Sequence, residues 1–201
     1  MDYKTYIWHT LLADIGNEYG VAGLMGNLQA ESGLIPYRLQ GDFSSGYSVS
    51  IEYTNNVDSG AISEYDFVNN GPNGGGYGLA QWTFSSRKQA LFNMKNSGGY
   101  SSIGSIELAC DYLLYELKTS YPGVYNTLRT ALSIRQASDV VLHDFENPAD
   151  QSANVEFVRA SLGTAIYKEL IGTDPTVPSG NRRKNKYNFI LFNKRRRRKH
   201  G

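Results

Sequence analysis

The residue of this sequence best placed for acid–base chemistry is a glutamate at the end of an apolar helix. Residues 21–32 predict a helix, because Val21, Leu24 and Leu28 recur at the spacing of one helical face, and Glu31 continues that face. Partial burial and the negative end of the helix dipole both disfavour a charged carboxylate there. A carboxylic acid that keeps its proton can protonate a leaving sugar oxygen, so Glu31 is a candidate general acid. The alternative is a helix-end glutamate that faces solvent.

A second candidate segment, about fifty residues later, could hold a polymeric ligand. Residues 71–78 contain five glycines, which allow a backbone to approach a ligand closely or to adopt a positive φ. No Gly-Lys-Ser/Thr follows, so the loop is not a phosphate-binding loop. Gln81 can donate and accept hydrogen bonds with sugar groups, and Trp82 offers a flat apolar face. The alternative is a surface loop with Trp82 in the core.

These segments together resemble the goose-type lysozyme and soluble lytic transglycosylase superfamily. The finer pattern is similar to the bacteriophage tail lysozymes of Gram-positive hosts, and related domains occur in wall-degrading proteins of conjugative elements. The resemblance covers roughly residues 5–172, and its motifs are specific in combination rather than singly. The matching pieces are residues 26–32 with Pro36, residues 76–83, residues 86–88 and residues 144–148.

The resemblance implies a lysozyme-like domain that cleaves the β-1,4 bond between N-acetylmuramic acid and N-acetylglucosamine in peptidoglycan, with no cofactor. It makes Glu31 the general acid. Asn147 departs from the pattern, because the family more often has Arg there, and an ionic role at this position is in doubt. The residues that we expect to bind substrate are Ser32, Tyr77, Gly78, Gln81, Trp82, Phe145 and Glu146.

Cleavage by hydrolysis also requires a second group that activates water or attacks the sugar. Glu52, Asp58 and Asp66 lie in the region that could form the opposite side of the cleft, although each taken singly is more typical of a solvated loop acid. Without such a partner, the 6-hydroxyl of N-acetylmuramic acid could attack, which is the lytic transglycosylase reaction. The acidic candidates and the tail-type motifs favour hydrolysis.

The elements that must position these residues predict a mainly α domain with a small extended insert. Residues 37–58 alternate around Tyr47 to Tyr53, which suggests a short hairpin or an extended flap. In the helix that carries Glu31, Gly23 and Gly26 predict close packing against another backbone. The other expected helices span residues 5–18, 61–69, 86–96, 103–119, 124–132, 134–146 and 154–171.

Charge and composition divide the chain into a domain over residues 1–172, which the resemblance makes the lysozyme-like catalytic domain, a linker over 173–180 and a basic tail over 181–201. The 19 acidic residues and 10 of the 20 basic residues precede Pro175, so this part carries a formal charge of −9. The tail holds the other 10 basic residues. It could contact anionic wall polymer, or it could be a disordered terminus or the remnant of another domain.

Several classes of protein are disfavoured by the sequence. It has no run of 18 apolar residues to span a membrane, and its N-terminus has no signal-peptide pattern, which favours delivery on a phage tail or release to the cell wall. Cys110 lies on an apolar stripe, which predicts a thiol buried in the core. The sequence contains no metal-binding motif, so we expect no metal site. The expected partners are peptidoglycan glycan strands and other phage tail or conjugation proteins, without specific nucleic acid. A non-catalytic wall-binding module or a structural tail protein remains the alternative.

Overall fold

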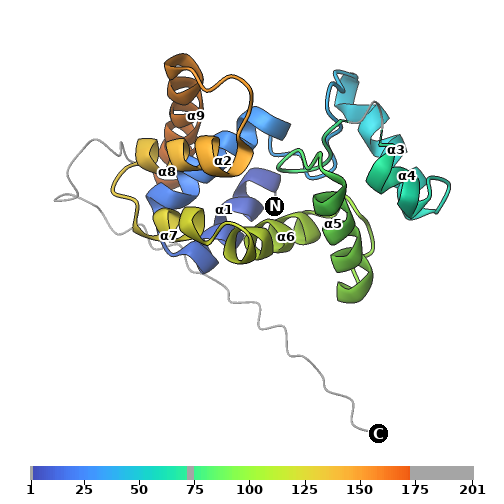
Figure 1. Cartoon of the computed structure of the whole chain (residues 1–201). Coiled ribbons are helices and arrows are strands. Elements are labelled where there is room, and N and C mark those ends of the chain that lie inside the picture. The colour runs from blue at the N-terminus through green and yellow to red at the C-terminus, as the bar shows by residue number, and fades with distance from the viewer. Residues whose placement is uncertain (1, 72–74, 173–201) are drawn as a thin grey trace, which may run out of the picture.

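The fold is mainly α-helical, as predicted from the sequence. The computed structural model describes residues 2–71 and 75–172, and Figure 1 shows how the helices are arranged. The helices are α1 (Tyr3–Ile15), α2 (Glu18–Ser32), α3 (Ser48–Asp58), α4 (Glu64–Asn69), α5 (Ser85–Gly98), α6 (Ile106–Thr119), α7 (Pro122–Thr130), α8 (Ile134–Val141) and α9 (Ala153–Ile171), with a 3₁₀ turn at Ser45–Tyr47 and a π turn at Leu142–Glu146. The predicted linker and basic tail lie outside the described residues.

Helix α2 is the central element, and it packs most extensively against α9 and α8. A Cβ atom on Gly26 would lie 2.3 Å from the carbonyl oxygen of Arg159, and one on Gly23 would lie 2.6 Å from the amide nitrogen of Ser138. Both distances are shorter than any van der Waals contact. The glycines of α2 therefore allow backbone-to-backbone packing, which confirms the prediction made from them.

The insert differs from the predicted hairpin or flap. Residues 48–58 form helix α3, and its buried positions Ser50, Thr54 and Val57 recur at helical spacing. Two of these three residues are polar, so the sequence shows no apolar helical stripe. Among the residues that the structure describes, extended pairing is limited to isolated bridges that Tyr77 makes with Leu39 and with Trp82.

Two irregular segments, one between α2 and α3 and the other between α4 and α5, lie between the α3–α4–α5 part of the molecule and the part built on α2, α8 and α9 (Figure 1). They are joined by backbone hydrogen bonds, from the Gln40 amide to the Gly76 carbonyl and from the Gly78 amide to the Arg38 carbonyl. This pairing fixes the first loop, after α2, against the second loop, before α5.

The apolar core runs through both parts of the domain. Cys110 is fully buried in it, as predicted, and burial raises the pKa of its thiol to about 12. A thiol in this setting is not a nucleophile near neutral pH. Within the described part of the chain, no helix is both long and apolar enough to cross a membrane.

Candidate active site

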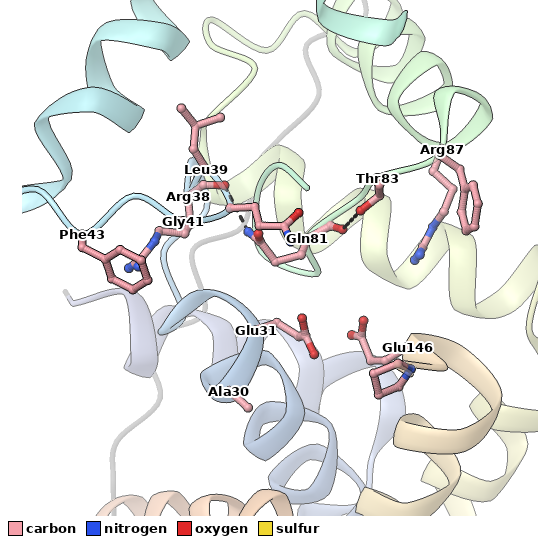
Figure 2. Close-up of a pocket in the computed structure, with 13 residues that line it drawn as sticks. Ala30, Glu31, Arg38, Leu39, Gly41, Phe43, Gln81, Thr83, Arg87 and Glu146 are labelled. Carbon is pink, nitrogen blue, oxygen red and sulfur yellow. Dashed lines mark hydrogen bonds between the residues drawn. The ribbon is translucent and has the colours of Figure 1, made fainter. Parts of the chain in front are cut away.

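A groove of about 500 Å³ lies between the two parts of the domain, and it holds the candidate catalytic residues (Figure 2). We call its two faces the helical side and the loop side. The helical side comprises Ala30 and Glu31 at the end of α2, together with Glu146 and Pro148. The loop side comprises residues of the segments 38–43 and 81–84; Arg87 of α5 completes the lining.

Glu31 occupies the last turn of α2, and its side chain is 20% exposed to the groove. Its carboxylate forms an ion pair with Arg159 of α9, with a distance of 2.5 Å from Nη2 to Oε1. The same guanidinium donates from Nη1 to Oδ1 of Asn27, which is fully buried. Asn27 in turn donates to the carbonyl oxygen of Ser138. Glu31 is thus held by a buried polar chain that joins α2, α8 and α9.

Glu146 faces Glu31 from the π turn, and Figure 2 shows the two carboxyl groups turned toward each other. Its Oε1 atom is enclosed and has no hydrogen-bond partner among the described residues. Burial raises the pKa of Glu146 to about 8, and the negative charge of Glu31 contributes to the increase. Two carboxyl groups in one groove therefore have different surroundings, because only Glu31 has a cation bonded to it.

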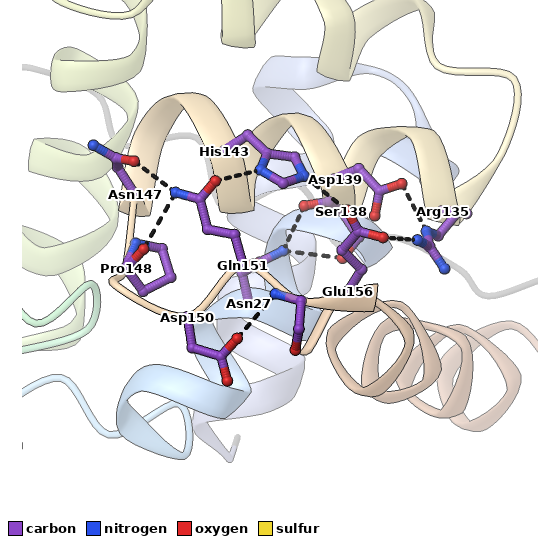
Figure 3. A network of polar contacts seen from close by, with 11 residues as sticks. Asn27, Arg135, Ser138, Asp139, His143, Asn147, Pro148, Asp150, Gln151 and Glu156 are labelled. Atoms are coloured by element: carbon purple, nitrogen blue, oxygen red, sulfur yellow. Dashed lines mark hydrogen bonds and ion pairs between the residues drawn. The ribbon is translucent and has the colours of Figure 1, made fainter. Parts of the chain in front are cut away.

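A polar network fixes the π turn that carries Glu146 (Figure 3). Gln151 donates from Nε2 to Oδ1 of Asn147, at 2.6 Å, and its Oε1 contacts Nδ1 of His143, at 2.8 Å. Nε2 of His143 contacts Glu156 on α9, and these two partners raise the pKa of His143. Asn147 has a left-handed conformation with φ of 45°, and it ends the turn. This residue, where the sequence left an ionic role in doubt, therefore makes a neutral hydrogen bond.

Gln81 lies on the loop side, across the groove from the two glutamates (Figure 2). Its Nε2 donates to the carbonyl oxygens of Arg38, at 3.1 Å, and of Gly78, at 3.0 Å. Its backbone has a positive φ of 46°. Since non-glycine residues seldom adopt this conformation, the surrounding loops must hold it there. The side chain amide is therefore fixed at the edge of the groove before any ligand binds.

Trp82 and Tyr77 are buried, so neither ring is available to a sugar in this structure. Trp82 is fully enclosed and donates from Nε1 to Glu116, at 2.9 Å. The hydroxyl group of Tyr77 is hydrogen bonded to Thr54. The prediction that these aromatic residues contact substrate is corrected, and the alternative, Trp82 in the core, describes the structure.

Three further expected binding residues also support the groove rather than line it. Gly78 has φ of 80°, and a Cβ atom on it would lie 2.9 Å from the ring of Trp82. The buried hydroxyl of Ser32 donates to the carbonyl oxygen of Leu28. Phe145 is buried with Arg87 stacked over its ring. Of the expected binding residues, the structure brings only Gln81 and Glu146 into the groove with Glu31.

The three acidic residues expected opposite Glu31 do not line the groove. Glu52 is exposed on α3. Asp58 accepts a hydrogen bond from the Ile103 amide, and Asp66 accepts one from Ser63 within the first turn of α4. Asp66 thus stabilises the start of its own helix, and Asp58 links the end of α3 to the segment before α6. The carboxyl group that faces Glu31 is instead Glu146, which comes from a segment more than one hundred residues away in the chain.

Two groove residues were missed in the sequence and are strongly exposed. Phe43 is 90% exposed and Phe84 is 71% exposed, and both lie on the loop side. Exposed phenylalanine rings beside a polar groove are suited to stack on sugar rings. Arg159, the partner of Glu31, was also missed. The sequence gives one indication of its role, because Arg159 is the one basic residue in the central part of the helix expected over residues 154–171.

Comparison with known proteins adds one finding. A family model described as phage tail lysozyme matches residues 2–170. No curated protein and no solved structure gives a significant match to the chain.

Proposed function

The chain belongs to the phage tail lysozyme family, and from this premise we propose that it hydrolyses the β-1,4 bond between N-acetylmuramic acid and N-acetylglucosamine, with Glu31 as a catalytic carboxyl group. Membership of the family gives the protein a peptidoglycan-lytic role in general terms. The reaction type and the catalytic residue are our proposal. We further propose that the protein acts at a phage tail, where it opens the cell wall locally.

One observation carries this proposal: Glu31, a second carboxyl group and a fixed amide converge on one groove. Glycoside hydrolysis requires an acid for the leaving oxygen and a carboxylate for the other half of the reaction. Glu31 and Glu146 supply two carboxyl groups on the helical side, and Gln81 supplies hydrogen-bonding atoms across from them. A wall-binding module has no requirement for a pair of facing carboxyl groups.

The ion pair with Arg159 defines the role of Glu31 in this proposal. The sequence predicts Glu31 as the proton donor, but an ion pair with the Arg159 guanidinium favours the charged carboxylate over the neutral acid. As a charged group, Glu31 would stabilise the positive charge that develops on the sugar ring and accept a proton from the attacking water.

The test is digestion of purified Gram-positive peptidoglycan by the wild type and by Glu31→Gln, with mass spectrometry of the products. We expect reducing muropeptides from the wild type and at least about a 100-fold lower rate from Glu31→Gln. Glu52→Gln is the matched control, because Glu52 is an exposed carboxylate outside the groove. It should digest peptidoglycan at the wild-type rate.

Three results would contradict the proposal in different ways. A folded wild type that releases no product would exclude the enzymatic function. Products with 1,6-anhydro ends would replace hydrolysis by transglycosylation. Full activity of Glu31→Gln would remove Glu31 from the catalytic machinery.

A further inference from the structure

We propose that Glu146 is the general acid of this site and that it protonates the leaving oxygen of the glycan, while Glu31 is its charged partner. This inference rests on the proposed function and deepens it, because it assigns the two halves of the reaction to two named carboxyl groups. It also replaces the role predicted for Glu146, which was to bind substrate at the edge of the cleft.

The first argument is geometric. Glu31 and Glu146 come from separate elements, the end of α2 and the π turn, and both line the same groove. Figure 2 shows their carboxyl groups facing each other, with Gln81 on the opposite side. A glycan strand bound between the two sides would place its glycosidic bond beside both carboxyl groups.

The second argument concerns the cations near Glu146. Arg87 is committed to Glu116, to which it donates from both Nε and Nη2. Arg159 is committed to Glu31 and to Asn27. Neither guanidinium forms a hydrogen bond or ion pair with Glu146 within the described part of the chain, so this carboxyl group lacks the partner that would favour its charged form.

The third argument is the state of the Glu146 oxygens. Oε1 is enclosed without a hydrogen-bond donor, which is costly for a carboxylate and tolerable for a neutral carboxylic acid. The groups that influence Glu146 from the surrounding elements are Glu31, Arg87, Arg159 and Glu116, and burial is the largest influence. Burial and the two acids raise the pKa, whereas the arginines lower it, and the result is about 8. Glu146 therefore keeps its proton at neutral pH, beside a Glu31 carboxyl group that is paired with Arg159.

The proposed step conserves atoms and charge. The proton of Glu146 passes to the bridging oxygen, and the bond from that oxygen to C1 of N-acetylmuramic acid breaks. The N-acetylglucosamine part leaves with a neutral hydroxyl group, and Glu146 becomes a carboxylate. The positive charge at C1 is stabilised by Glu31 until a water oxygen bonds to C1 and its released proton goes to Glu31. Proton exchange with solvent then restores the resting state.

A substrate that requires no protonation separates the two carboxyl groups. The experiment compares wild type, Glu146→Gln and Glu31→Gln on peptidoglycan and on a short glycan fragment with dinitrophenol attached to C1 of its N-acetylmuramic acid. Dinitrophenolate leaves without a proton, so loss of a general acid should matter little on this substrate. We expect Glu146→Gln to lose at least about 100-fold on peptidoglycan and less than about 10-fold on the activated fragment. Glu31→Gln should lose activity on both.

A pH profile gives a second readout that a structural role of Glu146 would not change. Wild-type cleavage of peptidoglycan should fall as the pH rises through about 8, where Glu146 loses its proton. The same enzyme should show no such decline on the activated fragment. Thermal unfolding of each variant establishes that it is folded before its rate is compared.

The outcomes separate this inference from the proposed function. Equal losses of Glu146→Gln on both substrates, or no loss on either, would overturn the assignment of Glu146. Rescue of Glu31→Gln by the activated fragment would make Glu31 the acid instead. In each of these cases the wild type still digests peptidoglycan, whereas a wild type without any products would reject the proposed function itself.

Discussion

The two sides of the groove are built in different ways. The helical side depends on regular helices whose backbones touch, with Gly23 and Gly26 of α2 against α8 and α9. The loop side is irregular, and it is held by a few backbone hydrogen bonds and by the buried side chain of Trp82. The first side presents one carboxyl group paired with the buried Arg159 and one with an enclosed oxygen that has no donor, and the second presents an amide and exposed rings.

This difference indicates a division between chemistry and recognition. Catalytic groups need precise positions, so the two carboxyl groups that we propose as catalytic are expected on a tightly packed part of the molecule. A polymer requires aromatic and polar contacts spread over a longer surface, which loops can provide. The predictions below test whether the helical side is rigid and electrostatically coupled and whether the loop side serves binding alone.

The largest expected effect concerns the dependence of stability on pH. Glu146 has a pKa of about 8 in the folded protein, above its ordinary value of 4.5. Between these values the folded state keeps a proton that the unfolded state has lost, so the free energy of unfolding falls as the pH rises. Glu146→Gln has no carboxyl group at this position, so its free energy of unfolding should not fall for this reason. We expect the variant to gain stability relative to wild type from pH 5 to pH 8, by at most about 5 kcal/mol.

Urea unfolding of both proteins at intervals across this range measures the effect. Glu52→Gln is again the control, because an exposed carboxylate should leave the pH dependence unchanged. If the free energies of unfolding of wild type and Glu146→Gln changed with pH in parallel, Glu146 would not retain a proton in the folded protein. The helical side would then not be electrostatically coupled in the way that we infer.

The next effect concerns the backbone contact between α2 and α9. In Gly26→Ala the new methyl group would meet the backbone of Arg159 and of Gly163, neither of which can move as a flexible side chain can. We expect a loss of about 1–3 kcal/mol in the free energy of unfolding, as for overpacked cores. Activity should fall as well, since Arg159 positions Glu31. Gly123→Ala, with open space around the new methyl group, should be neutral in both measurements.

The smallest effects are expected on the loop side. Phe43→Ala and Phe84→Ala remove exposed rings, so stability should stay within about 0.5 kcal/mol of wild type. Each ring that stacks on sugar contributes about 0.5–1.5 kcal/mol, which corresponds to a KM several-fold higher with kcat unchanged. Kinetics on soluble glycan fragments provide the measurement, and Leu132→Ala, another exposed apolar residue, is the control. If these substitutions lowered kcat and left KM unchanged, the loop side would take part in the chemical step, and the division between chemistry and binding would be wrong.

The sequence was sufficient for the helical fold and for the helix that carries Glu31. Apolar stripes of the usual spacing give the helices, and Gly23 and Gly26 indicate a close backbone contact without identifying the partner. Helix α3 was wrongly predicted as extended because its buried face is largely polar, with Ser50 and Thr54. Periodicity of apolar residues does not detect such a helix.

The electrostatic arrangement was beyond the sequence, because it depends on contacts between distant segments. Arg159 is 128 positions from Glu31 in the chain, and only the packing of α9 on α2 brings them together. The resemblance placed Glu146 near the cleft, but its position opposite Glu31 depends on a π turn that no pattern of residues predicts. Trp82 was misassigned because the sequence does not distinguish a tryptophan that binds a ligand beside a glycine-rich loop from one that is buried and anchors that loop.

The π turn also has a consequence for how this site can change over generations. A π turn spans one more residue per hydrogen-bonded ring than an α-helix does, as the bond from the Asn147 amide to the Leu142 carbonyl shows. It is therefore equivalent to a single-codon insertion in a regular helix. Deleting one residue there would shorten the turn and rotate Glu146 away from the groove, with every side chain type retained. On the role that we propose for Glu146, the site depends on the length of this segment as well as on its composition, and a one-residue deletion should lower activity as a substitution of Glu146 would.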